Sequence, residues 1–116
     1  MKVVAVDPDP AELLQLTDSI RKVYSDVSVE SFKDPLLAVK YVFGNPVDAV
    51  YTVTGMKRMS GFELAKLMRG IRPDLRLHFI AGSETERIDA MRMMAESCIL
   101  RPVSAEALRS AAAEDW

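Results

Sequence analysis

The amino-acid sequence predicts an α/β fold, in which a parallel β-sheet is covered by helices on both faces. Two observations lead to this prediction. Five short apolar segments alternate with five longer segments, several of which repeat apolar residues every three or four positions. The short segments are apolar along most of their length, which is typical of strands that are buried on both faces and joined by right-handed crossovers.

The predicted elements follow one another without a low-complexity linker or an internal repeat. The predicted strands cover residues 2–6, 27–32, 47–53, 75–81 and 98–100. The predicted helices cover about 9–23, 35–44, 61–70, 84–95 and 105–116. Residues 1–116 are therefore expected to form a single domain, which is long enough to bury a core without disulfides or a structural metal.

Each helix is predicted from its first residues as well as from its apolar periodicity. Asp9 and Asp34 each precede a proline, so each is expected to be an N-cap with proline at the first helical position. Ser104 is the expected N-cap of the last helix. Capping boxes are expected for the pairs Asp9 with Glu12, Ser60 with Glu63, and Ser83 with Glu86.

The side-chain patterns also predict which faces are buried. Residues 27–32 alternate apolar and polar side chains, which indicates a half-covered edge strand. In the fourth helix, Met91 is expected to continue a core stripe. Met93 and Met94 could reach the surface near the last strand and contact a partner, with core filling as the default. Trp116 could contact the core or a partner.

Composition limits the class of protein. Of the 116 residues, 49% are hydrophobic and 28% are charged, as in ordinary globular domains, and the net charge of −2 favours neither nucleic acid nor membrane binding. No apolar run approaches the length of a bilayer span and no signal peptide opens the chain, so a cytoplasmic location is expected. The single Cys98 is expected to be a small buried hydrophobe, and the single His78 a packed or edge-lying side chain. With one residue of each type, an internal disulfide and a two-histidine catalytic site are excluded.

Three segments of the sequence resemble the receiver domain of bacterial two-component response regulators. They are Val3–Pro10, Asp48–Leu64 and Ile99–Leu108, and they occur in the order and spacing of that family across nearly the whole chain. The resemblance implies a flavodoxin-like (CheY-like) doubly wound sheet of five strands in the order 2-1-3-4-5, with five helices. It also implies a role in phosphorelay signal transduction.

The resemblance further implies where a phosphorylation site would lie. In the family, an acceptor aspartate ends the third strand, eight residues before a loop glycine. Gly61 is that glycine here, which puts Val53 at the acceptor position. An aliphatic side chain can neither attack a phosphoryl group nor bind a metal. The motif from Gly61 to Leu64 argues against a shifted register in which Thr52 or Thr54 would be the acceptor.

The other family site positions also differ in this chain. The acidic pair after the first strand is Asp7 followed by Pro8, the hydroxyl position is Ala81, and the lysine position is Arg101. Asp9 is expected to cap a helix rather than bind a metal. We therefore expect weak or absent Mg²⁺ binding, no cofactor, and an ion pair between Asp7 and Arg101. By the same resemblance, Pro102 is expected to follow a cis peptide bond.

These observations predict a non-enzymatic, receiver-like signalling domain, a pseudo-receiver that binds a protein partner or a second copy without being phosphorylated. The family resemblance implies that the fourth helix, fifth strand and fifth helix form the contact surface, and the candidate residues there are Met93, Met94, Cys98 and Arg109. Two alternatives stay open. One is a conventional receiver with an atypical acceptor, and the other is a small-molecule site in a vacated pocket around Asp7, Val53, Ala81 and Arg101.

Overall fold

The computed structural model describes the backbone of residues 1–115 and the side chains of residues 1–111, so Trp116 lies outside the described residues. Five parallel strands form one sheet in the order β2-β1-β3-β4-β5, as predicted. The strands are β1 (Lys2–Val6), β2 (Ser28–Phe32), β3 (Ala49–Val53), β4 (Arg76–Ala81) and β5 (Ser97–Leu100). The helices are α1 (Pro10–Val23), α2 (Pro35–Gly44), α3 (Gly61–Ile71), α4 (Glu84–Arg92) and α5 (Ala105–Asp115).

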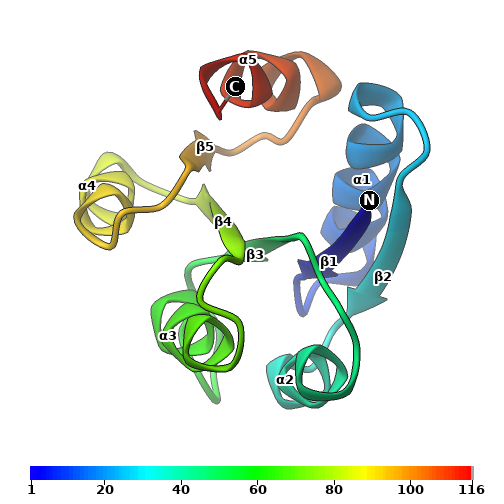
Figure 1. Cartoon of the computed structure of the whole chain (residues 1–116). Helices are drawn as coiled ribbons and strands as arrows, with labels where there is room; N and C mark the ends of the chain where they lie inside the picture. The colour runs from blue at the N-terminus through cyan, green and yellow to red at the C-terminus, as the bar shows by residue number, and fades with distance from the viewer. Residues whose placement is uncertain (116) are drawn as a thin grey trace.

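The helices divide between the two faces of the sheet (Figure 1). Helices α1 and α5 pack side by side on one face, and α2, α3 and α4 lie on the other. Alternate residues of the central strands therefore enter two separate cores, since successive side chains of a strand point to opposite faces. Tyr51 and Val53 of β3 enter the α1/α5 core, and Val50 enters the other. Every residue of β3 is buried.

The helix N-termini confirm the predicted caps and correct two of the predicted capping boxes. Asp9 accepts hydrogen bonds from the backbone N–H groups of Ala11 and Glu12, at 2.9 and 3.2 Å. The N–H of Asp9 donates to Asp7 Oδ1 at 2.9 Å, so the Glu12 side chain is not its partner, and the reciprocal half of the box is not made. At α4, the Glu86 carboxylate accepts hydrogen bonds from the Thr54 hydroxyl and the Gly82 N–H, and the reciprocal bond to the N-cap Ser83 is not made.

Helix α4 corrects the predicted position of Met91. Met91 is 48% exposed instead of continuing a core stripe, and Ala90 is the fully buried residue of this helix. The helix ends at Arg92, so its last turn does not carry the predicted stripe onward. Met93 is partly buried and packs against the core beneath α2, α3 and α4, whereas Met94 is 81% exposed and so takes the surface alternative instead of the default of core filling.

His78 is packed within the sheet, which is the first of the two placements predicted for it. It is 2% exposed, its ring stacks on Tyr51 with 4.3 Å between centroids, and its Nδ1 lies 2.6 Å from the hydroxyl of Ser97. The hydroxyls of Tyr51 and Tyr24 share a further hydrogen bond of 2.9 Å. Burial lowers the pKa of His78 to about 4.

Cys98 is half-buried, and burial raises the pKa of its thiol to about 11. The thiol is therefore neutral at physiological pH, which fits the prediction of a small hydrophobic side chain at this position of β5.

Candidate functional site

The carboxyl ends of four strands bring the sequence-predicted site residues to one edge of the sheet. Asp7 follows β1, Val53 ends β3, Ala81 ends β4 and Arg101 follows β5. Backbone hydrogen bonds fix this edge, because the N–H of Thr54 donates to the carbonyl of Ile80 at 3.0 Å and that of Arg101 donates to Ala81 at 3.0 Å. Parallel strands place their chemistry at this edge.

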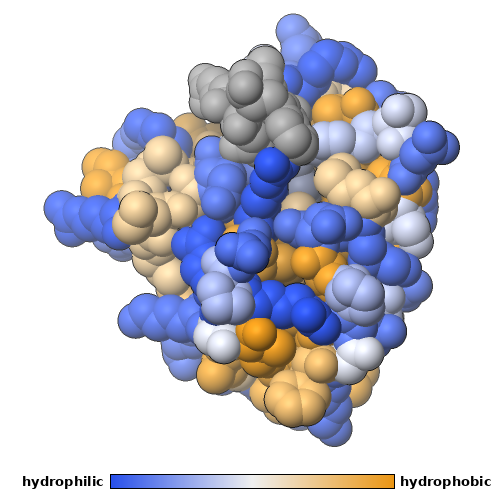
Figure 2. Space-filling view, in the orientation of Figure 1, coloured by the Kyte–Doolittle hydropathy of each residue, from blue (hydrophilic) through white to orange (hydrophobic). Residues whose placement is uncertain are grey.

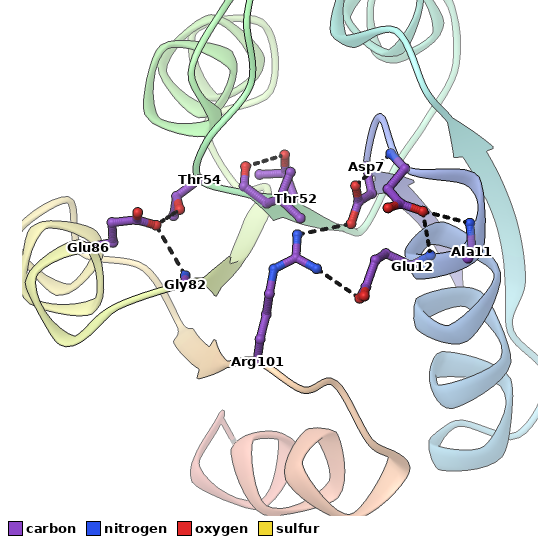
Figure 3. A network of polar contacts seen from close by, with 10 residues as sticks. Asp7, Ala11, Glu12, Thr52, Thr54, Gly82, Glu86 and Arg101 are labelled. Atoms are coloured by element: carbon purple, nitrogen blue, oxygen red, sulfur yellow. Dashed lines mark hydrogen bonds and ion pairs between the residues drawn. The ribbon is translucent and has the colours of Figure 1, made fainter.

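Arg101 forms the ion pair that the sequence predicts. Its guanidinium reaches Asp7 Oδ2 at 3.3 Å and Glu12 Oε2 at 2.8 Å, and so it joins β1, α1 and the segment after β5 (Figure 3). Glu12 was predicted only as a capping residue. Its place in the first turn of α1 puts it on the same edge as Asp7, and this proximity is the signal that could have identified it as a second partner for Arg101.

Asp7 is the buried member of this network. Its residue is 3% exposed, and both carboxylate oxygens are in use, Oδ1 by the N–H of Asp9 and Oδ2 by Arg101. Burial raises the pKa of Asp7 above its usual value, although the Asp9 N–H and the Arg101 guanidinium both act to lower it. Arg101 therefore compensates only part of the cost of burying this charge.

Val53 is held in its predicted register by Gly61. The N–H of Gly61 donates to the carbonyl of Thr54 at 2.8 Å, and a Cβ atom at Gly61 would lie 2.1 Å from the carbonyl oxygen of Val53. Only glycine allows this close approach. The eight-residue spacing therefore reflects a real backbone contact, and the Val53 side chain, whose residue is 2% exposed, lies in the α1/α5 core.

Both threonines that flank Val53 are buried and hydrogen-bonded. Thr52 donates its hydroxyl to the carbonyl of Val53 at 3.1 Å. The hydroxyl of Thr54 donates to the Glu86 carboxylate, which also accepts the N–H of Gly82 at 3.2 Å (Figure 3). Glu86 thus ties the ends of β3 and β4 to the start of α4. From the sequence, Glu86 is expected only to take part in capping α4.

A cleft of about 720 Å³ opens at this edge, displaced from the predicted position of the vacated pocket. Asp7 and Arg101 line it, but Val53 and Ala81 do not, since they are buried beneath the edge. The prediction of a pocket around all four residues is therefore wrong for Val53 and Ala81. The full lining is Asp7, Pro8, Asp9, Lys33, Asp34, Pro35, Gly55, Met56, Lys57, Arg58 and Arg101.

The remaining predicted residues are distributed as follows. Pro8 and Asp9 line the cleft, and the peptide bond before Pro102 is cis, as predicted. Met94 and Arg109 are exposed on the α4/α5 side, away from the cleft lining. Among the described residues, no group of three or more His, Cys, Asp or Glu is arranged to hold a metal ion, and no helix is long and apolar enough to cross a bilayer.

Solved structures with the same fold come from response regulators. A response regulator receiver domain protein from Clostridium thermocellum has 20% identity and a TM-score of 0.83, with 98% of this chain and 92% of that one covered. The response regulatory domain of protein mrkE from Klebsiella pneumoniae has 23% identity and a TM-score of 0.83 over 96% and 91%. Vibrio cholerae chemotaxis protein CheY4 has 18% identity and a TM-score of 0.83 over 99% and 98%.

These structural matches define a flavodoxin-like α/β domain. A search of curated proteins by sequence finds no match. The family model of the response regulator receiver domain matches residues 3–113. The chain therefore belongs to the response regulator receiver domain family, and it has the signalling fold of two-component systems.

Proposed function

We propose that this protein is a pseudo-receiver, a cytoplasmic signalling domain that acts by binding a protein and is not itself phosphorylated. The observation that supports this most directly is the aliphatic side chain of Val53 at the end of β3. Its methyl groups lie in the α1/α5 core and offer no nucleophile at the position where the family resemblance implies an acceptor.

The residues present do not fit a magnesium ion, which receivers of this family are expected to use. Magnesium requires several oxygen ligands in near-octahedral geometry. Both oxygens of Asp7 are already hydrogen-bonded, Pro8 and Val53 offer no side-chain ligand, and the Arg101 cation lies 3.3 Å from the Asp7 carboxylate. In this proposal the guanidinium offsets part of the Asp7 charge in the place where a metal ion would do so.

Without a phosphoryl group or a metal ion at this edge to favour a second state, the domain has no phosphorylation-driven change of conformation, because a ligand shifts a population only by its preference for one state. Its output would therefore depend on its partner. The side of α4 and β5 supports a contact surface, since hydrophobic residues gather over α4 at the left of Figure 2. The large exposed hydrophobic residues there are Ile88, Met91, Met94 and Leu100.

A phosphorylation assay tests the first part of the proposal. The protein is incubated with Mg²⁺ and acetyl phosphate, and its intact mass is measured alongside that of a conventional receiver as positive control. No added phosphoryl group is expected. A stoichiometric phosphoryl adduct would overturn the proposal, and Thr52→Val and Thr54→Val variants would then identify an atypical acceptor.

The contact surface is tested by charge substitutions on that side of the molecule. Met91→Asp and Met94→Asp are expected to abolish self-association measured by light scattering, or binding to a purified partner, without changing the circular dichroism spectrum. Leu14→Asp is the matched control, because Leu14 is an exposed hydrophobic residue on α1, outside this surface. Equal loss in the control, or no loss in either methionine variant, would contradict the assignment of this surface.

A further inference from the structure

The cleft described above lies at the switch point of the sheet. Helix α1 follows β1 onto one face, whereas α2 and α3 follow the neighbouring strands β2 and β3 onto the other. The loops after these three strands separate at this point and form the cleft walls. Open α/β sheets bind their ligands in such crevices at the carboxyl ends of the strands. The volume of about 720 Å³ is in the range of small-molecule sites.

Three cations in the cleft walls are not neutralised by the protein. Lys33 comes from the loop after β2, and Lys57 and Arg58 come from the loop after β3. Across the side chains described for residues 1–111, none of the three forms an ion pair with a carboxylate. They therefore remain available to a negatively charged ligand.

The acidic residues of the same walls are already engaged. Asp7 is bound by Arg101 and by a backbone N–H. Asp9 caps α1, and Asp34 caps α2 by accepting the N–H of Leu36 at 2.9 Å. The capping carboxylates keep their charge, but the walls hold four cations (Lys33, Lys57, Arg58 and Arg101) against three carboxylates, so the lining has a small positive excess. Lys33, Lys57 and Arg58 are the cations in it that have no carboxylate partner among the described side chains.

The cleft also has an apolar part. Pro8, Pro35 and Met56 line it, and the Met56 side chain is only partly buried against both cores. Methionine adapts its shape to irregular ligands, and prolines give rigid apolar walls. The lining therefore combines unpaired cations with an adaptable hydrophobic surface.

We propose that this cleft binds a small organic anion, whose acidic group contacts Lys57, Arg58 and Lys33 while its apolar body lies against Met56 and the prolines. The inference goes beyond the proposed function and does not depend on it, because the contact surface near α4 and the cleft are formed by different residues.

The proposal is tested by titrating the full chain with 1-naphthyl phosphate, an anion with an apolar body, and following backbone amide shifts by NMR. Saturable shifts are expected in the loops that contain Lys33 and Met56 to Arg58, weakening with added salt. The comparison compounds are inorganic phosphate, which lacks the apolar body, 1-naphthol, which lacks the charge, and 1-naphthoate, which replaces phosphate by carboxylate.

The double variant Lys57→Glu/Arg58→Glu is expected to weaken binding by about tenfold or more, equivalent to about 1.4 kcal/mol, and Lys33→Glu to weaken it in the same direction. Lys22→Glu/Lys66→Glu, on exposed helix surfaces outside the cleft, is the matched control and should leave the affinity unchanged. Equal binding of 1-naphthol would refute the anionic contact, and equal binding of inorganic phosphate would refute the apolar one. The absence of shifts in these loops would overturn the proposal, whereas binding of naphthoate alone or of both anions would support it.

Discussion

Arg101 offsets two negative charges at the strand edge, because its guanidinium forms ion pairs with both Asp7 and Glu12. Arg101→Met is expected to lower the free energy of unfolding by about 1–3 kcal/mol near neutral pH, since it leaves Asp7 as an uncompensated buried charge. The loss of the cation raises the pKa of Asp7 further, so the destabilisation should shrink as the pH falls and Asp7 becomes protonated. Urea denaturation at several pH values measures both effects.

The double variant Asp7→Asn/Arg101→Met serves as the control for that experiment. It removes both charges, so it should be more stable than Arg101→Met alone and should lack the pH-dependent recovery. If Arg101→Met were as stable as the unchanged protein at all pH values, the ion pair would contribute nothing measurable.

Of the two contacts that Arg101 makes, only one could be predicted from the sequence. The pairing of Asp7 with Arg101 was predictable, because an unpaired acid and a base were both expected at one strand edge. The contact of Glu12 with Arg101 was not predictable, because the local sequence motif indicates that Glu12 bonds to the Asp9 N–H. In the structure that N–H donates to Asp7 instead. A short motif specifies donors and acceptors, but tertiary neighbours decide which of them meet.

At the scale of elements, the junction of β3 and α3 depends on the absence of a side chain at Gly61. Gly61→Ala is expected to destabilise the protein by about 1–3 kcal/mol, because a Cβ atom would overlap the Val53 carbonyl and force the backbone to move. Gly70→Ala in the same helix meets nothing within 4 Å and should be neutral or stabilising by about 0.5–1 kcal/mol. Thermal denaturation of the pair separates packing from helix propensity, and equal effects would contradict the close contact.

Helix α4 has only one buried residue and depends on the contact that Glu86 makes with Thr54 and Gly82. Glu86→Ala is expected to increase amide hydrogen exchange across residues 84–92 more than in α3, because local stability follows local contacts. Glu84→Ala, which removes only an exposed pair with Arg87, is the matched control. Unchanged exchange in α4 would show that Glu86 does not secure this helix.

The element boundaries were largely predictable because caps, prolines and apolar strands are local signals. The buried side of α4 was not, since its apolar residues repeat at helical spacing yet the helix ends at Arg92 and packs through Ala90. The contact of α4 with β4 and β5 buries Ala90 and leaves Met91 exposed, and the sequence pattern does not encode this tertiary contact.

For the whole molecule, His78 links stability to pH. Its pKa in the folded state is about 4, against an ordinary value of 6.5, so the unfolded chain takes up a proton first as the pH falls. The neutral histidine contributes stability that is present above pH 6.5 and is lost between pH 6.5 and about 4, by about 3 kcal/mol in total.

Equilibrium unfolding across that interval, compared with His78→Gln, tests this dependence. The variant should be less stable overall, because it loses the stacking on Tyr51, and its stability should change less with pH across this interval. The raised pKa of Asp7 acts in the opposite direction in acid, so the difference between the two profiles isolates His78. Parallel profiles would contradict the role given to His78.

The overall fold was predictable from the alternation of elements, and the family resemblance supplied the strand order. The cleft was not, because three loops without a periodic pattern form its walls. Val53 and Ala81 were expected to border an open space, but Val53 lies in the α1/α5 core and Ala81 is fully buried at the end of β4. A change of residue type at a site therefore does not predict a cavity there.

The ion pair that joins Asp7 to Arg101 spans 94 positions of the chain. During synthesis the carboxylate leaves the ribosome long before its cation has been made, and domains form their long-range contacts late. In a nascent chain that ends before residue 101, the Asp7 carboxylate has no guanidinium partner and stays hydrated at the end of β1. The Asp7–Arg101 contact can therefore form only after nearly the whole of this domain has been synthesised.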